Sequence, residues 1–230
     1  MKRPSWQQTA LALPPLQGPT LANFIADGNA MLVQLLERLG TGALPPRRMH
    51  LVGPAGCGKS HLLHAVGAAV LQRGGIVRKI DIATLPDVDD ACWQLSDLVI
   101  IDDLDVMRLD ADQAGRLVAL DAHGFGAWLS ASRTHPGSCP ALVPDLASRL
   151  AADSFMVQPL DEQGRERALR AYARDRGILL PEHIWRYLLT RAERSMSDLV
   201  ALLDRMDRAS LSAGRPITVP FLRTLLQSTS

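Results

Sequence analysis

Cysteine is scarce in this 230-residue chain, which has only Cys57, Cys92 and Cys139. An odd number of distant cysteines argues against a disulfide framework and is typical of reduced thiols in a cytosolic protein. There is no C-x-x-C or H-x-x-x-H pair, which argues against a zinc site. The chain also lacks a stretch that would form a signal peptide or a membrane span. We therefore expect a cytoplasmic protein with no membrane partner.

A surplus of one charge is missing as well, because 25 Lys and Arg residues balance 24 Asp and Glu residues to a net charge of +1. Nucleic-acid binders use a basic surplus to neutralise phosphates, so we expect little direct DNA binding. The apolar fraction of 47% is ordinary for a folded globular protein. The length suits one α/β domain with a small appended unit.

The periodicity of apolar residues divides the chain into three parts. Residues 1–20 have no helical period and predict an extended arm. Residues 21–160 alternate helices with unbroken Val/Ile runs, which predicts an α/β domain with a parallel sheet buried on both faces. Its expected strands are 48–52, 76–82, 97–103, 126–132 and 155–160. One expected helix ends near Gly40, and a second covers 61–71. Residues 161–230 predict a small helical domain, with helices at 161–176, 181–192 and 195–212 and after Pro220.

The segment 53–60 fits the P-loop pattern G-x-x-x-x-G-K-S/T between a predicted strand and a predicted helix. Gly53, Gly56 and Gly58 let the loop turn its backbone N–H groups toward phosphates, and the helix dipole adds to that field. Lys59 is expected to reach the β- and γ-phosphates, and Ser60 to ligate Mg²⁺. The pattern predicts binding of ADP or ATP with Mg²⁺; the alternative is a chance glycine-rich turn.

Two carboxylates follow the buried run 98–101, at the end of a strand where ligands gather in open α/β sheets. This pattern is similar to a Walker B motif. Asp102 would then hold Mg²⁺, and Asp103 would orient water or act as a general base. The alternative is a pair of solvated acids that close a strand.

Together these motifs resemble the AAA+ ATPases, and among them the DnaA/Hda family, over nearly the whole chain. The segment 20–25 with Gly28 and Asn29 is similar to the family's N-terminal box near the adenine, which implies that Phe24 contacts the nucleotide. His61, directly after the P-loop, belongs to the same expected nucleotide-binding set. The segment 144–150 is similar to the one that carries the arginine finger.

The resemblance implies that Arg149 reaches the nucleotide of a neighbouring subunit. An arginine can place a bidentate positive charge on the developing charge of a γ-phosphate, and can do so in trans. The alternative is a surface arginine on a helix, which would contribute little to stability.

Only a few residues follow Phe221 and Leu222, so we expect no counterpart of the DNA-binding helix-turn-helix domain of DnaA, and this expectation favours the shorter, Hda-type members of the family. In the arm, the segment 8–13 resembles a degenerate clamp-binding peptide. Gln8, Leu11 and Leu13 would contact the sliding clamp, with an apolar pocket for the leucines. The alternative for the segment is a disordered arm.

The resemblance implies a negative regulator of DNA replication initiation. With the DNA-loaded sliding clamp, the chain would promote hydrolysis of ATP bound to DnaA. The rival interpretations are a self-acting AAA+ ATPase and a DnaA-like adaptor that recruits another partner. A homo-oligomer is left open.

Two positions depart from the family pattern. Ser132 stands where the family's sensor 1 has an acid, although the adjacent Arg133 agrees. In the predicted helical domain, Ser197 stands where an arginine usually reads the nucleotide, and Arg194 is out of register. We therefore expect weak intrinsic hydrolysis, or a nucleotide that serves mainly as a structural ligand.

Overall fold

Five strands form one parallel sheet, as the sequence predicted, and their order is β2-β3-β4-β1-β5. The strands are β1 Arg48–Val52, β2 Val77–Lys79, β3 Leu98–Ile101, β4 Ala127–Ser132 and β5 Ser154–Met156. The computed structural model describes residues 18–45, 47–82, 85, 95–104, 109–122, 126–139, 142–190 and 195–213. Within these ranges no helix is both long and apolar enough to cross a membrane.

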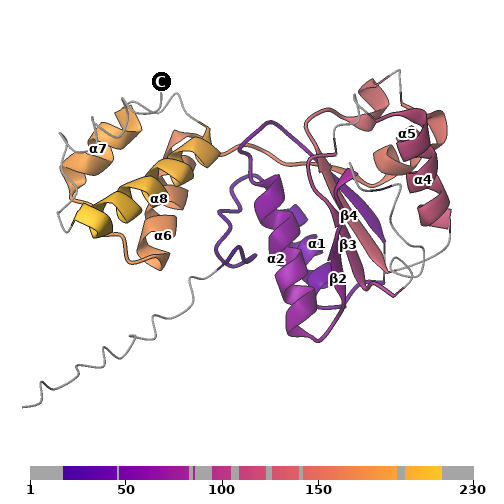
Figure 1. Ribbon diagram of the computed structural model, residues 1–230, viewed down its shortest axis with the longest axis horizontal. Helices are drawn as coiled ribbons and strands as arrows, with labels where there is room; N and C mark the ends of the chain where they lie inside the picture. Colours follow the sequence, from indigo (N-terminus) through magenta and orange to yellow (C-terminus); the bar gives the residue numbers. More distant parts are fainter. Residues whose placement is uncertain are drawn as a thin grey trace, which may run out of the picture.

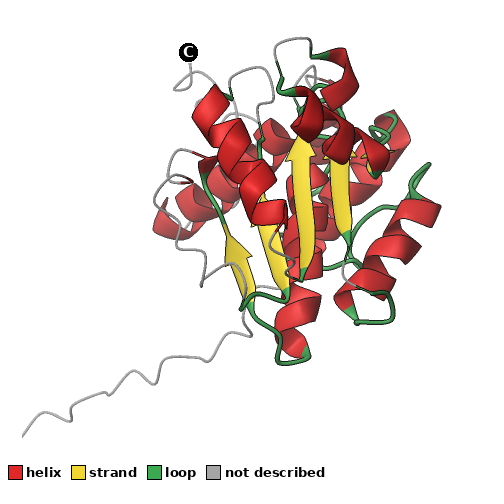
Figure 2. Cartoon of the chain, turned by 90° about the vertical axis from the view of Figure 1, so that its right-hand side faces the viewer, coloured by secondary structure: helices red, strands yellow, loops and turns green. Residues whose placement is uncertain are grey.

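Helices cover both faces of this sheet (Figures 1 and 2). The helices are α1 Ala30–Gly40, α2 Lys59–Gln72, α4 Ala111–Ala122 and α5 Pro144–Ala152. Alternate side chains of a strand point to opposite faces. In β4, Leu129 and Ala131 therefore pack with α1 and α2, whereas Trp128 packs with α4 and α5. Helix α4 has no counterpart among the predicted helices.

Strand β5 begins one residue earlier and ends four residues earlier than predicted. The backbone of Gln158 does not continue the ladder, because both of its polar groups bond to the side chain of Asn29. The Asn29 amide donates to the Gln158 carbonyl at 3.0 Å and accepts from its N–H at 2.8 Å. Pro159 follows and has no N–H to donate. Strand β2 is also shorter than expected, and it lies at the edge of the sheet.

A second hydrophobic core lies among the last three described helices, drawn on the left of Figure 1. They are α6 Glu162–Asp175, α7 Glu182–Thr190 and α8 Met196–Ala213. Asp161 caps α6 by accepting a hydrogen bond from Gly164 N at 2.6 Å. Ser195 and Asp198 bond reciprocally at the start of α8. These helices match the predicted ranges within two residues, and the helix predicted after Pro220 lies outside the described residues.

Candidate nucleotide-binding site

The P-loop joins the carboxyl end of β1 to the start of α2. Gly56 and Gly58 have φ angles of 76° and 98°, in the left-handed region that favours glycine. No side chain caps the first turn of α2, whose N-cap is Gly58. The N–H groups of a helix start need partners outside the helix, and an anion is a suitable one. The loop geometry therefore fits a phosphate.

Close contacts leave no room for side chains in two of the loop glycines. A Cβ on Gly53 would lie 2.8 Å from both Cys57 Sγ and the carbonyl of Val157. A Cβ on Gly58 would lie 2.6 Å from Phe24 Cε2. Cys57 is buried beneath the loop, where it packs with the hydrophobic core.

Lys59 lies folded over the loop that precedes it. Its Nζ donates to the carbonyl of Gly53 at 2.7 Å and to that of Pro54 at 2.9 Å. An ionised phosphate oxygen attracts an ammonium more strongly than a neutral carbonyl oxygen does, because both partners are then charged. A phosphate in the loop would therefore compete well for this ammonium.

Ser60 and Asp102, predicted as metal ligands, lie together at the carboxyl edge of the sheet. Ser60 Oγ donates to Asp102 Oδ1 at 3.2 Å across 42 residues of sequence. The same carboxylate oxygen accepts from Asp103 N at 2.9 Å. Mg²⁺ prefers oxygen ligands and is usually held by one or two protein groups together with phosphates and water. The pair fits such an ion, and its role remains a prediction.

Asp103 is a non-glycine residue with a left-handed backbone, at φ 51°. Such backbones store strain and cluster at functional sites. Its carboxylate lies 4.0 Å from Arg133 Nε, and both side chains are mostly exposed. The turns after β3 and β4 therefore place a negatively charged and a positively charged side chain opposite each other, beside the Ser60 and Asp102 pair.

Phe24 and His61 form one contact beside the loop. Their ring centroids are 5.5 Å apart, and His61 Nε2 lies 2.9 Å from the carbonyl of Thr20. Burial lowers the pKa of His61. Because the Thr20 carbonyl can only accept, a neutral His61 carries its proton on Nε2 and donates it there. Phe24, the expected contact of the adenine, therefore lies beside His61 of the same expected nucleotide-binding set.

The start of α8 approaches the tip of the P-loop. A Cβ on Gly56 would lie 3.2 Å from Met196 N and 3.4 Å from Ser195 Cβ. Ser197 is exposed in the first turn of this helix, directly after the two residues that approach the loop. Arg194 lies outside the described residues, as do the three arm residues Gln8, Leu11 and Leu13.

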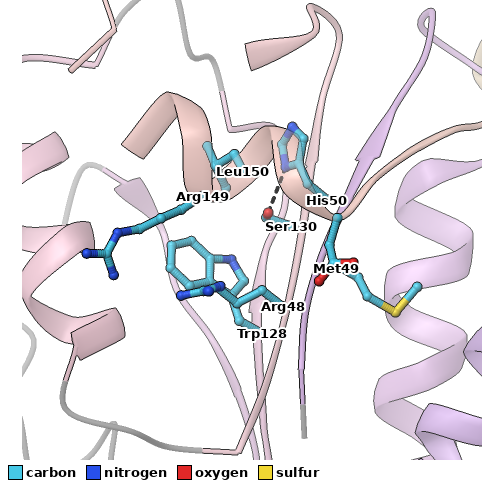
Figure 3. A pocket seen from close by; sticks show the side chains of 8 residues that line it. Arg48, Met49, His50, Trp128, Ser130, Arg149 and Leu150 are labelled. Carbon is cyan, nitrogen blue, oxygen red and sulfur yellow. Dashed lines mark hydrogen bonds between the residues drawn. The ribbon is translucent and has the colours of Figure 1, made fainter. Parts of the chain in front are cut away.

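Arg149 lies at the opposite end of β1 from the P-loop, near Arg48 (Figure 3). Its Nη1 donates to Asp121 Oδ2 at 2.5 Å, and its Nε and Nη2 donate to Asp145 at 2.8 and 3.0 Å. Its side chain is 30% exposed. It is therefore not a free surface arginine, since two carboxylates hold it.

Beside Arg149 lies a narrow depression that leaves no room for a water molecule. It is lined by Arg48, Met49, His50, Trp128, Ser130, Arg149, Leu150 and Asp153. His50 was assigned no role from the sequence, yet its ring is bonded on both sides: Nδ1 lies 2.8 Å from Ser130 Oγ and Nε2 lies 2.8 Å from Ser132 Oγ. In the sequence, the pattern that could have marked His50 is a histidine inside an otherwise apolar predicted strand.

Asp121 was also missed by the sequence analysis. It follows the buried Leu117 by four residues on α4, so both lie on one face of the helix. This spacing could have marked it as an inward-facing acid that needs a cationic partner. Because α4 itself was not predicted, the signal was not used.

Residues 161–226 match the family model described as the Hda lid domain. Three solved structures are similar to the chain in fold. Domain III of the Thermotoga maritima replication initiation protein DnaA is 18% identical, with a TM-score of 0.76 over 94% of this chain and 97% of that one. AMPPCP-bound DnaA from Aquifex aeolicus is 20% identical, with a TM-score of 0.67 over 82% of this chain and 65% of that one. The Thermotoga maritima RuvB branch migration motor is 16% identical, with a TM-score of 0.64 over 93% and 72%.

Proposed function

We propose that this chain is a DnaA-related AAA+ protein and a negative regulator of DNA replication initiation. The match of residues 161–226 to the Hda lid domain and the fold shared with DnaA domain III support this proposal. In the proposal it binds the sliding clamp loaded on DNA and docks on DnaA that carries ATP. It then promotes hydrolysis of that ATP, which converts DnaA to its ADP form. The site of action is the cytoplasm.

The position of Arg149 is the observation that carries the proposal. Arg149 and Arg48 share Asp121 at the amino end of β1, whereas the P-loop begins after its carboxyl end. Five residues of strand span roughly 13 Å at about 3.3 Å per step. Arg149 therefore lies away from the chain's own phosphate site. This placement supports a role in trans, where the guanidinium would stabilise charge on the γ-phosphate of a neighbour.

The chain's own nucleotide is proposed to be ADP or ATP held at the P-loop. Lys59 would bind the β- and γ-phosphates, Ser60 and Asp102 would hold Mg²⁺, and Phe24 with His61 would border the base. Bound Mg²⁺ would neutralise phosphate charge. The AMPPCP-bound DnaA structure supports the choice of ligand. A ligand that binds only the folded state also stabilises it, so this nucleotide would favour the docking-competent fold.

The clamp contact is proposed from the sequence of the arm alone. Gln8 would hydrogen-bond at the rim of the clamp's pocket, and Leu11 and Leu13 would fill it. Docking on the clamp would raise the effective concentration of the chain near DnaA on the same DNA. The proposal therefore requires the arm for activity with the clamp and does not require it for nucleotide binding.

A second candidate is an ATPase that turns over its own nucleotide. The contact between Ser60 and Asp102 and the left-handed backbone of Asp103 support it, because residues of the predicted P-loop and Walker B motifs lie together. Steady-state hydrolysis by the isolated chain, abolished in Lys59→Ala and Asp103→Asn, would support this candidate. Hydrolysis that stays at background in the isolated wild type would exclude it.

The test measures hydrolysis of ATP prebound to DnaA, with and without DNA-loaded clamp. We expect wild type to accelerate it only with the clamp and Arg149→Ala to lose the acceleration. Arg78→Ala, an exposed arginine of β2, is the matched control and should act as wild type. A Gln8→Ala, Leu11→Ala double variant should fail to accelerate hydrolysis even when the DNA-loaded clamp is present. If Arg149→Ala accelerates hydrolysis as well as wild type does, the chain is an adaptor and the proposal is wrong.

A further inference from the structure

Two arginines from different elements converge on one oxygen of Asp121. Arg149 Nη1 donates to Asp121 Oδ2 at 2.5 Å, and Arg48 Nη1 donates to the same oxygen. Arg149 comes from α5, Arg48 from β1 and Asp121 from α4. The Asp121 side chain is only 3% exposed. It is therefore a fixed, buried anchor rather than a mobile surface acid.

This arrangement commits most of the hydrogen-bonding capacity of Arg149. A guanidinium has five N–H donors, and three of them are used on Asp121 and Asp145. Hydrogen bonds to Asp145 and then to Asp121 raise the pKa of Arg149, so it is charged at every accessible pH. One positive charge thus faces two carboxylates. A phosphate would have to replace at least one of them, since both repel it.

The two carboxylates differ in how they could give way. Asp145 lies one turn before Arg149 on α5 and is half exposed, so it can move with the arginine. Asp121 belongs to another helix and cannot follow. The buried carboxylate nevertheless keeps a charge partner when Arg149 leaves, because Arg48 stays on the same oxygen. Leaving a buried charge without any partner would be costly.

From this geometry we propose that Asp121 is a latch. It holds Arg149 against α4 in the free chain and releases Arg149 to the nucleotide of the docked partner. Arg48 stays bound to Asp121 and neutralises its charge. The inference rests on the proposed function of Arg149 and adds its regulation. Asp121 is a positioning residue, because it acts through Arg149 and does not touch the partner's nucleotide.

The latch predicts opposite effects for two substitutions. Asp121→Asn removes the negative charge that holds Arg149. Arg149 is then released, so a lower concentration of this protein suffices to stimulate hydrolysis. The concentration that gives half-maximal stimulation of DnaA-bound ATP hydrolysis should fall about 5- to 10-fold, while the maximal rate stays unchanged. Arg48→Gln leaves Arg149 as the only cation on Asp121, so the same concentration should rise several-fold. Asp153→Asn is the matched control, because Asp153 pairs with Arg47, and it should act as wild type.

A second readout needs no partner. Phenylglyoxal modifies accessible guanidinium groups, and the rate at Arg149 can be followed by mass spectrometry of the full chain after digestion. The rate should rise in Asp121→Asn, fall in Arg48→Gln and stay unchanged in Asp153→Asn. The Arg48 side chain is 42% exposed and Arg149 still neutralises Asp121 in its absence, so Arg48→Gln is compatible with folding even if Asp121→Asn is unstable.

Each failure has its own signature. If Arg149→Ala stimulates hydrolysis like wild type, the proposed function is wrong, and the modification rates still test the latch. The other case is that wild type stimulates hydrolysis and Arg149→Ala does not. The latch is then overturned if the concentration for half-maximal stimulation is as high for Asp121→Asn as for wild type, or higher. It is also overturned when Arg48→Gln leaves the reactivity of Arg149 unchanged or raises it.

Discussion

Nε2 of His50 lies 2.8 Å from the hydroxyl of Ser132, in the strand next to the P-loop strand. Ser132 donates its own hydrogen to the carbonyl of Thr134 at 2.6 Å. A hydroxyl has one hydrogen, so Ser132 must accept from His50, and the ring carries its proton on Nε2. In the neutral ring Nδ1 is then the acceptor for Ser130, which lies 2.8 Å away. Burial disfavours the charged ring, so the folded state requires a neutral imidazole at neutral pH.

This requirement predicts acid sensitivity. Burial, with a smaller effect from the charge of His135, lowers the pKa of His50 from 6.5 to about 4. The unfolded chain therefore binds the proton first, so the contribution to stability is complete above pH 6.5 and is lost as the pH falls toward 4. The full loss is about 3 kcal/mol. Urea unfolding measured between pH 7.5 and 4 should show this dependence as a slope of the free energy of unfolding against pH.

The matched variants isolate His50 in that measurement. His50→Gln should be less stable at pH 7.5 but should lose much less stability on acidification. His183→Gln, at an exposed position on α7, should keep the wild-type slope. An unchanged slope in His50→Gln would show that other groups cause the acid sensitivity.

Lys59→Ala should weaken nucleotide binding about 10- to 100-fold, because a hydrogen bond to a charged group contributes about 1.5–3 kcal/mol. Titration of a fluorescent ADP or ATP analogue measures the Kd. Lys79→Ala removes an exposed lysine of β2 and should leave the Kd unchanged. Equal affinity of Lys59→Ala and wild type would place the phosphates elsewhere.

Substitutions of the two glycines at the ends of α2 distinguish the cost of backbone strain from the cost of side-chain crowding. Gly74 has φ 83°, and a Cβ there would meet nothing within 4 Å, whereas Gly58 has φ 98° and a Cβ there would meet Phe24 at 2.6 Å. Gly74→Ala should cost about 1–2 kcal/mol from strain alone. Gly58→Ala should cost about 2–4 kcal/mol, because Phe24 must also move. Chemical denaturation measures both.

The crowding part can be tested by a double-mutant cycle. In a Phe24→Leu background, Gly58→Ala should cost no more than Gly74→Ala does. If the cost of Gly58→Ala is the same in both backgrounds, the contact with Phe24 does not limit this position.

Asn29→Ala should destabilise the chain by about 2–4 kcal/mol. Asn29 is buried, and its side chain bonds to both backbone groups of Gln158, which would lose their partner. Asn23→Ala is the control, since the Asn23 side chain bonds to the nearby backbone of Thr20 and Gly18, and it should cost less than about 1 kcal/mol. Equal losses of unfolding free energy would contradict a special role for the Asn29 bridge.

Local patterns predicted the parallel sheet and the three described helices of the lid well. The predicted strand 48–52 matches β1, and the predicted strand 97–103 contains β3, because unbroken apolar runs are required in a sheet covered on both faces. Predictions were weaker at β5, where a distant side chain ends the strand. Periodicity contains no information on such a contact, since Asn29 and Gln158 are 129 residues apart.

The sequence by itself determined the P-loop pattern, because its glycines permit the local backbone turn that leads into Lys59 and Ser60. It also determined the two acids after β3 and the apolar runs that build the sheet. Only the tertiary structure brought Arg149 and Arg48 to Asp121, from 28 and 73 residues away, and enclosed His50 between two serines. The reason is physical: charges and polar groups choose partners by distance and burial, and the order of strands sets both.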